Sequence, residues 1–365
     1  MLVQGPPGSG KTYTSAKIIL SLLKDNKKVG ITSNSHKAIN NLLTQIEELA
    51  EEENFTFKGL KKSSKEEQRL NGKIIEDVSG RMKEFPKDYL LHAGTAWLFS
   101  DPRYDLKMDY LFVDEAGQVA LANTLAIATS TKNIILIGDQ MQLSQPIQGI
   151  HSGNSGKSAL DFLLEGEDTI PVSRGIFLSE TRRLNKNICD YISSSFYDFR
   201  LKPHPVTSER SLELDLKNIK NEGIVFLPTD HKDCTQKSDE EAKIIKDYYS
   251  KIIGKDSIDV GKNKKITQDD IMVVTPFNMQ VNNLKKIINQ NEAKIGTIDK
   301  FQGQQSKVVF ISMTSSDPEN LPRHKEFFFS RNRLNVGISR AQSLAIILFN
   351  PSLLLANCQK INEMR

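Results

Sequence analysis

The 365-residue sequence has few cysteines and histidines and only one tryptophan. Its three cysteines, Cys189, Cys234 and Cys358, lie far apart and show no C-x-x-C spacing. That arrangement disfavours a disulfide framework or a zinc site, and it favours a reducing, cytoplasmic environment. The six histidines are scattered, so they suggest no metal cluster.

The sequence also lacks long apolar runs and a strong excess of charge of either sign. No run approaches the roughly 18 residues that a membrane-spanning helix needs, and the N-terminus shows no signal segment with a cleavage site. The net charge of +4, from 49 basic and 45 acidic residues, is too small to indicate nucleic-acid binding by itself. With 38% hydrophobic residues, the chain can build sizeable cores, and its length favours two domains.

Near the start, the stretch GPPGSGKT has the form G-x-x-x-x-G-K-T, with a short apolar run before it and a helical pattern after it. This strand, glycine-rich loop and helix are the context of a phosphate-binding loop. Gly5, Gly8 and Gly10 would let backbone N–H groups surround phosphates, Lys11 would reach the β- and γ-phosphates, and Thr12 would hold Mg²⁺. The alternative is a chance glycine-rich turn.

Short β-branched runs alternate with helical patterns along most of the chain, which is the α/β pattern. Eight runs are candidate strands of parallel sheets: KKVGITS, DYLFVDEA, NIILIGD, GIVFLPT, DIMVVTP, AKIGTID, KVVFISM and LAIILFN. Helices are expected around residues 34–53, 186–195 and 278–289. A break near residues 165–174 predicts two α/β domains, 1–170 and 171–365.

Two lysine-rich stretches do not follow this pattern. Residues 51–90 have weak helical periodicity, so we expect a small insertion or mobile arm in the first domain; a long surface loop is the alternative. The stretch GKNKKITQDD, near Gly261, is expected to be a solvated loop.

Two further runs end in polar residues that suit nucleotide chemistry. Asp114 and Glu115 close the apolar run of LFVDEAGQ, where Asp114 would bind the metal through water and Glu115 would deprotonate the attacking water. The run IILIGDQMQLSQP presents Asp139 and Gln142, and Gln142 would reach a water near the γ-phosphate. These two residues could instead only shape a turn.

Arginines form the last candidate group. LSETRRLN contains Arg182 and Arg183, and RNRLNVGISRAQ contains Arg331, Arg333 and Arg340. Arginine stabilises charge on a transferring phosphoryl group. A nucleotide in one lobe and arginines in the other would indicate a cleft that closes on ATP, whereas the usual reading of a basic run is a solvated face.

The motifs together resemble those of superfamily 1 helicases. The resemblance rests on nine ordered stretches: GPPGSGKT, ITSNSHKAIN, AGTAW, VDEAGQ, GDQMQLSQP, LSETRRLN, VVTPFNMQ, GTIDKFQGQQ and NRLNVGISRAQ. DEAGQ and TIDKFQGQ resemble the 5′-to-3′ group, superfamily 1B. Several stretches, including the terminal CQKINEMR, are similar to the helicase half of bacterial proteins that join a RecB-like nuclease to such a helicase.

The resemblance implies two tandem RecA-like P-loop domains that use ATP and Mg²⁺, with a RecB-like nuclease domain or subunit as a partner. It implies that Gln142 senses the γ-phosphate, that Arg183 and Arg340 reach across the cleft, and that Gln302 and Gly303 link the ATP site to nucleic acid. It also implies contacts to a single-stranded DNA or RNA backbone from six residues: Ser33, Asn34, Thr95, Pro276, Asn278 and Thr297.

Some positions depart from the family pattern. Arg182 stands where an aromatic residue usually stacks on adenine, and Gln305 replaces an acidic residue. The family also places a helix with an adenine-reading glutamine before the phosphate loop, but this chain begins at the strand. No RecB-like nuclease segment is present. We therefore expect a fragment, a split gene product or a truncated start.

Three classes of function remain open at this point. The first is an ATP-driven DNA or RNA translocase that moves 5′ to 3′. The second is a protein-remodelling ATPase, which is disfavoured because the arginines are in the same chain as the phosphate loop. The third is a truncated or degenerate binding module, which is disfavoured because each catalytic residue type is present.

Overall fold

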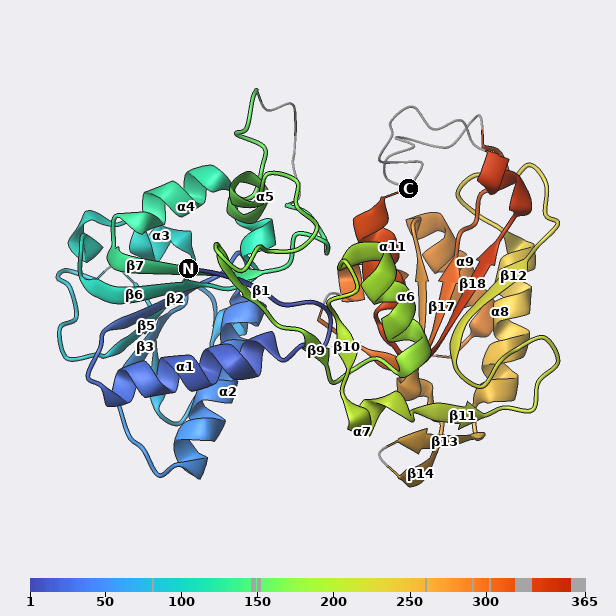
Figure 1. Cartoon of the computed structure of the whole chain (residues 1–365), viewed down its shortest axis with the longest axis horizontal. Helices are drawn as coiled ribbons and strands as arrows, with labels where there is room; N and C mark the ends of the chain where they lie inside the picture. Colours follow the sequence, from blue (N-terminus) through green and yellow to red (C-terminus); the bar gives the residue numbers. More distant parts are fainter. Residues whose placement is uncertain are drawn as a thin grey trace. The chain divides into compact units, whose positions relative to one another are not determined.

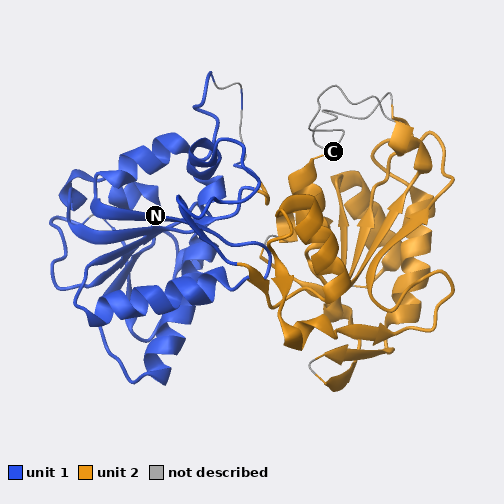
Figure 2. Cartoon of the chain, viewed as in Figure 1, with its two compact units in different colours: residues 1–140, 144–178 blue, residues 141–143, 179–365 orange. Residues whose placement is uncertain are grey.

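The computed structural model describes residues 1–80, 82–145, 149, 152–259, 261–290, 292–301, 303–318 and 330–355. Contacts divide the chain into two compact units (Figure 2). Unit 1 comprises residues 1–140 and 144–178, and unit 2 comprises residues 141–143 and 179–365. Each unit combines helices with a large parallel sheet, which confirms the predicted α/β fold class.

Unit 1 is built on an eight-stranded sheet of order β4-β3-β5-β2-β6-β7-β1-β8, with every neighbouring pair parallel. Its strands are β1 (Leu2–Gln4), β2 (Val29–Thr32), β3 (Gly59–Lys62), β4 (Ile75–Val78), β5 (Leu91–Ala93), β6 (Met108–Val113), β7 (Thr131–Gly138) and β8 (Gly175–Phe177). Because all the strands are parallel, their carboxyl ends meet at one edge of the sheet, where ligands of such sheets usually bind.

Helices cover both faces of this sheet (Figure 1). They are α1 (Lys11–Lys24), α2 (His36–Glu52), α3 (Ala96–Phe99), α4 (Leu121–Ala128) and α5 (Ala159–Leu164). Apolar side chains of α1 and α2 form one core with the sheet, and those of α3, α4 and α5 form a second core on the other face. The sheet is therefore buried on both sides, as its nearly continuous apolar strands require.

Residues 51–90, expected to be an insertion, contribute β3 and β4 to the edge of this sheet. Charged side chains hold the segment in place. Lys61 is fully buried and pairs with Asp77, with Nζ 3.8 Å from Oδ1. The Glu47 carboxylate accepts hydrogen bonds from the amides of Ile74 and Ile75, both at 2.8 Å. A periodicity search based on apolar residues cannot detect such a segment.

Unit 2 is built on a five-stranded parallel sheet of order β12-β18-β17-β15-β16. Its strands are β12 (Gly223–Pro228), β15 (Ile271–Thr275), β16 (Lys294–Thr297), β17 (Ser306–Ser312) and β18 (Ala341–Phe349). Its helices are α6 (Lys186–Phe196), α7 (Pro205–Ser208), α8 (Asp239–Ile252), α9 (Asn278–Ile288) and α11 (Arg331–Ile338). Helices α8 and α9 pack on one face, while α6 and α11 lie on the other (Figure 1).

Two small sheets complete unit 2. One pairs β9 (Glu180–Thr181) with β10 (Lys202–Pro203), and the other contains β11 (Ser211–Glu213), β13 (Asp256–Asp259) and β14 (Lys262–Lys265). The stretch GKNKKITQDD, expected to be a solvated loop, is exposed but was wrongly predicted as a loop, because β14 pairs antiparallel with β13. All four residues of β14 are exposed, so no apolar alternation marks the strand.

Polar caps fix the starts of several helices. The Ser35 hydroxyl accepts a hydrogen bond from the Ala38 amide at 3.1 Å and begins α2. The Asn185 side chain accepts from the Ile188 amide at 3.0 Å and begins α6. Such caps satisfy amides that the helix itself leaves unpaired. Among the described residues, no helix is both long and apolar enough to span a membrane.

Candidate functional site

The phosphate loop joins β1 to α1 in unit 1 and depends on three glycines. Gly8 and Gly10 have φ angles of 72° and 77°, in the left-handed region that favours glycine. A Cβ on Gly5 would lie 2.1 Å from Cγ of Lys11, so a larger residue would displace the lysine. The Gly5 amide donates to the Gly138 carbonyl at 2.9 Å and ties the loop to the end of β7. The loop thus has the turns that close approach of a phosphate requires.

Lys11 and Thr12 are the first two residues of α1. The Lys11 ammonium donates to the Gly5 carbonyl at 2.6 Å, so its side chain lies over the loop. Gly10 precedes the helix, and no described side chain caps the amides of the first turn. These amides and the helix dipole favour an anion at this end of the helix. The loop, Lys11 and Thr12 can together hold the phosphates of a nucleotide.

Asp114 directly follows β6 at the carboxyl edge of the same sheet. Its side chain is 7% exposed, and its amide donates to the Thr32 carbonyl at 2.9 Å. Burial and then the charge of Glu115 raise the pKa of Asp114, whereas the charge of Lys11 lowers it. A buried carboxylate gains free energy from a nearby cation, since burial penalises its charged form. The residue therefore fits a divalent ion beside the phosphates.

Glu115 begins the turn after β6 with a φ of 53°, which is uncommon for a residue other than glycine. The turn packs closely against the neighbouring strand, since a Cβ on Gly138 would lie 2.8 Å from the Gly117 amide nitrogen. The Glu115 side chain is half-buried. The packing fixes the backbone of the predicted base.

Asp139 and Gln142, predicted from a single motif, lie in different units. Asp139 is buried in unit 1, where it accepts a hydrogen bond from Nε2 of Gln4 at 3.4 Å. This contact supports the turn-shaping reading for Asp139. Gln142 is in unit 2, where its carbonyl accepts from Nδ2 of Asn332 on α11 at 2.6 Å. Its role toward a γ-phosphate stays a prediction.

Arg183 and Arg340 lie close to the same short segment of unit 2. Arg183 donates from Nε to Oε1 of Gln305 at 2.7 Å and from Nη1 to the Ser339 carbonyl at 3.3 Å. Arg340 is 3% exposed and donates from Nη1 to the Gln304 carbonyl at 3.2 Å. The two predicted arginines are therefore held by adjacent residues, Gln304 and Gln305, just before β17. Their action on a phosphoryl group stays a prediction.

The motifs contain three other arginines. Arg182 is exposed, and Arg331 and Arg333 make contacts within unit 2. The Arg182 side chain is 68% exposed and lies 3.7 Å from a Glu180 carboxylate oxygen. Arg331 donates to the Ser195 carbonyl at 2.8 Å, and Arg333 lies 3.8 Å from Asp299. Arg331 and Arg333 thus make contacts within unit 2, whereas the Arg182 side chain is largely exposed.

Gly303, another residue of the predicted nucleotide motif, lies in the loop before β17. Gly303 has a φ of 78° and is exposed, so the chain turns there in a conformation that glycine favours. Gln302 lies outside the described residues.

The residues predicted to contact a strand backbone lie where sheet strands end. In unit 1, Ser33 and Asn34 follow β2, and Thr95 follows β5. Ser33 is only 3% exposed, whereas Asn34 is exposed.

In unit 2, the corresponding residues also lie at strand ends. Pro276 and Asn278 follow β15, and Thr297 ends β16, which pairs with β15. Each unit therefore presents its predicted strand contacts at the carboxyl edge of its own sheet.

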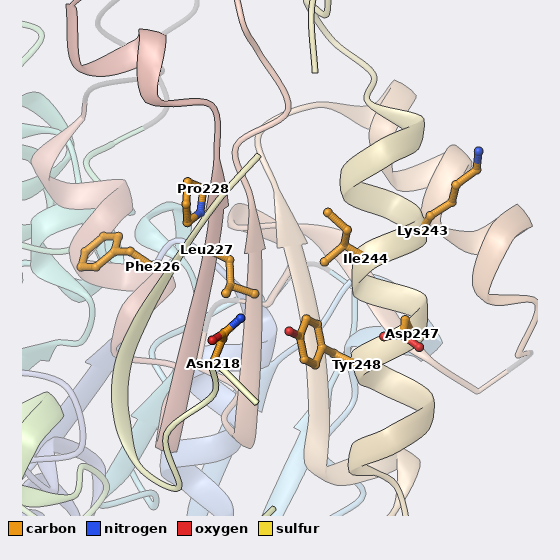
Figure 3. Close-up of a pocket in the computed structure, with 8 residues that line it drawn as sticks. All are labelled: Asn218, Phe226, Leu227, Pro228, Lys243, Ile244, Asp247 and Tyr248. Carbon is orange, nitrogen blue, oxygen red and sulfur yellow. The ribbon is translucent and has the colours of Figure 1, made fainter. Parts of the chain in front are cut away.

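A wide surface groove of about 750 Å³ lies elsewhere on unit 2, between β12 and α8 (Figure 3). None of the predicted site residues lines it. Its apolar wall includes Phe226, Leu227, Ile244 and Tyr248. This groove is therefore separate from the predicted nucleotide site.

Residues that hold the predicted side chains were missed by sequence reasoning. Gln305 was noted only as a departure from the acidic family residue, yet its amide oxygen accepts from Arg183. Asn335 on α11 is buried and donates to the Met141 carbonyl at 2.7 Å. Gln305 lies in the motif GTIDKFQGQQ and Asn335 in the motif NRLNVGISRAQ. This position was the one feature of the sequence that could have pointed to them.

The fold and the loop together define a P-loop nucleotide-binding protein with two tandem RecA-like units. Two family models, each described as AAA domain, match residues 158–352 and 1–147. The chain belongs to this AAA-domain family, and its relatives place it among the superfamily 1B helicases.

Two curated relatives come from Schizosaccharomyces pombe. The chain is 23% identical to DNA polymerase alpha-associated DNA helicase A over 407 residues, which covers 93% of this chain and 59% of the relative. It is 24% identical to the DNA replication ATP-dependent helicase/nuclease dna2 over 372 residues, which covers 95% of this chain and 26% of the relative. The chain thus spans only part of the length of these relatives.

A solved structure supports the fold. The DNA-bound structure of an arterivirus helicase, nonstructural protein 10, matches with a TM-score of 0.51 and 16% identity. The match covers 96% of this chain and 60% of the viral chain. At this identity the likeness shows the fold alone.

Proposed function

We propose that the chain is an ATP-dependent translocase or helicase that moves 5′ to 3′ on single-stranded nucleic acid. The observation that carries this proposal is the phosphate loop with Lys11 beside the buried Asp114, on one sheet edge of a chain from a helicase family. The proposed domains are residues 1–170, with the phosphate loop, and residues 171–365, with the arginines.

In this proposal four residues of unit 1 act in ATP hydrolysis: Lys11, Thr12, Asp114 and Glu115. Lys11 and the loop amides bind the β- and γ-phosphates, and Thr12 and Asp114 hold Mg²⁺. Mg²⁺ supplies charge neutralisation on the phosphate oxygens when bound. Glu115 orients the attacking water and accepts its proton.

Residues of unit 2 complete the proposed chemistry. Arg183 and Arg340 stabilise negative charge on the transferring phosphoryl group, and Gln142 contacts the γ-phosphate. Arg182 stacks on the base through its guanidinium plane, and Gly303 allows the loop beside these arginines to turn.

The proposed ligand of the two sheet edges is a single strand of DNA or RNA. Ser33, Asn34 and Thr95 of unit 1 contact its backbone, as do Pro276, Asn278 and Thr297 of unit 2. Small polar side chains and loop amides suit phosphates and sugars rather than base edges, so binding is largely independent of sequence. A RecB-like nuclease domain or subunit is the proposed partner.

A tailed duplex tests the proposed polarity. DNA is the probe, because both yeast relatives are named DNA helicases or DNA replication proteins. With ATP and Mg²⁺, the chain should separate a duplex that has a 5′ single-stranded tail and leave one with a 3′ tail intact. A blunt duplex is the matched control. Unwinding that requires the 3′ tail would overturn the proposed direction.

A further inference from the structure

Trp97 is an exposed aromatic residue at the predicted strand-binding edge of unit 1. It is the only tryptophan of the chain, and its side chain is 87% exposed. Tryptophan is usually highly buried, and its indole is among the largest apolar surfaces a residue can offer. An indole left in water contributes little to folding, so core packing does not account for Trp97.

The indole is mounted on a firmly packed element. It is the second residue of α3, and the next two residues, Leu98 and Phe99, are buried in the core of unit 1. The Leu98 amide donates to the Thr95 carbonyl at 2.9 Å. A Cβ on Gly94 would lie 2.8 Å from Cδ2 of Leu98, so the preceding turn is closely packed as well. The backbone that carries the indole is therefore fixed, so stacking has to order only the side-chain torsions of Trp97.

The neighbours of α3 are suited to phosphates. Helix α3 follows β5, and β5 lies between β3 and β2 in the sheet. Adjacent strands are about 4.7–4.9 Å apart, so the segment that carries Trp97 starts close to Asn34 after β2. Lys37, in the first turn of α2, is exposed at the same edge. On the other side, a Cβ on Gly94 would lie 3.3 Å from the Cβ of Lys62 in β3, whose ammonium donates to the Gly80 carbonyl.

We propose that Trp97 is a stacking platform for a nucleobase of the bound single strand. An aromatic ring beside polar and basic groups is the arrangement by which proteins hold single strands without reading their sequence, since every base has a π-face. The inference rests on the proposed single-strand binding and adds to it a base contact that the predicted backbone contacts do not supply.

The single tryptophan makes a direct test possible. The full chain is titrated with an oligothymidylate while its intrinsic tryptophan emission and the anisotropy of a labelled strand are recorded. Stacking should quench the emission, with the same Kd as the anisotropy change. An abasic strand of equal length should bind more weakly and leave the emission unchanged, because it has phosphates but no bases.

Variants separate stacking from a general loss of surface. Trp97→Ala should raise the Kd for oligothymidylate by roughly tenfold or more, and Trp97→Phe should restore part of the affinity. The abasic strand should bind Trp97→Ala and the parent alike. Phe199→Ala is the matched control, since Phe199 is 76% exposed in unit 2, and it should leave the Kd unchanged.

The outcomes distinguish this inference from the proposed function. If the parent binds oligothymidylate without a change in emission, or if Trp97→Ala binds it equally well, the stacking role is wrong while single-strand binding stands. An equal loss in Phe199→Ala would also overturn it. If the parent binds no single strand, the proposed function fails and this inference fails with it. The emission titration needs only the parent, so it decides the matter even if a variant does not fold.

Discussion

Glu115 has a positive φ that few non-glycine residues adopt, and it stands beside a buried aspartate at the end of β6. Loss of phosphate binding at Lys11 and loss of the base at Glu115 should therefore be separable by mutation. Lys11→Ala should abolish ATP hydrolysis, because the β- and γ-phosphates lose their charge partner. Glu115→Gln should retain ATP binding and lose about 10²–10⁴-fold in kcat, since the attacking water loses its base.

Steady-state hydrolysis and binding of a fluorescent ATP analogue measure the two effects separately. Asp109→Asn is a suitable control, because Asp109 lies near the opposite end of β6. A Glu115→Gln variant that hydrolyses ATP at nearly the parent rate would remove Glu115 from the role of base.

A second prediction at the residue scale concerns His92 and the pH dependence of the free energy of unfolding. Its ring is fully buried, stacks on Phe85 with centroids 5.1 Å apart and lies 3.2 Å from the Tyr104 hydroxyl. Burial lowers the pKa of His92 from 6.5 to about 4. Between these values the unfolded chain binds a proton that the folded chain does not. The free energy of unfolding should therefore fall as the pH drops from 6.5 to 4, by on the order of 3 kcal/mol.

Urea unfolding at several pH values measures this loss. His92→Gln has no titrating ring, so its stability should depend less on pH over the same interval. Equal pH slopes for the parent and the variant would contradict the assignment of the slope to His92.

At the scale of elements, the segment before β17 holds two arginines, one through a side chain and the other through a backbone carbonyl. Gln305 uses its side chain to hold Arg183, whereas Gln304 uses its backbone carbonyl to hold Arg340. Gln305→Ala should therefore lower kcat, by roughly threefold to tenfold for an exposed hydrogen bond to a charged group, with little change in the KM for ATP. Gln304→Ala is the matched control and should leave kcat near the parent value, because its carbonyl remains.

Gln305→Glu provides a further check on this segment. A carboxylate should still hold Arg183, so the arginine stays in place while part of its charge is neutralised. We expect a kcat between those of the parent and Gln305→Ala. Equal kcat values in the parent, Gln304→Ala and Gln305→Ala would show that the contact does not position Arg183.

The sequence predicts elements well where their apolar residues follow a pattern. All eight predicted strand runs contain strands, β2, β6, β7, β12, β15, β16, β17 and β18. β3 was not predicted because Lys61 replaces an apolar residue in its core, and β14 was not predicted because all of its residues are exposed. β5 has only three residues, which is too short for a period to be recognised.

The candidate site was accessible to sequence reasoning for a different reason. Lys11, Thr12 and Asp114 belong to motifs whose spacing follows from the chemistry of phosphates. The partners Gln305 and Asn335 act through tertiary contacts with residues more than a hundred positions away in the sequence. No local pattern specifies such contacts.

At the scale of the whole molecule, the predicted residues divide between the two units. The phosphate loop and both acidic residues are in unit 1, and Gln142, Arg183 and Arg340 are in unit 2. Both units also carry predicted single-strand contacts. A strand that binds both units would order them together, so single strands should stimulate hydrolysis.

The rate of ATP hydrolysis with and without an oligothymidylate tests the central claim most directly. The account predicts a low rate for the chain alone and a rate many times higher with the strand. That stimulation should decline as salt weakens the phosphate contacts, and Glu115→Gln should lack it. Hydrolysis at the same rate with and without single strands, DNA or RNA, over a range of salt concentrations would contradict the account.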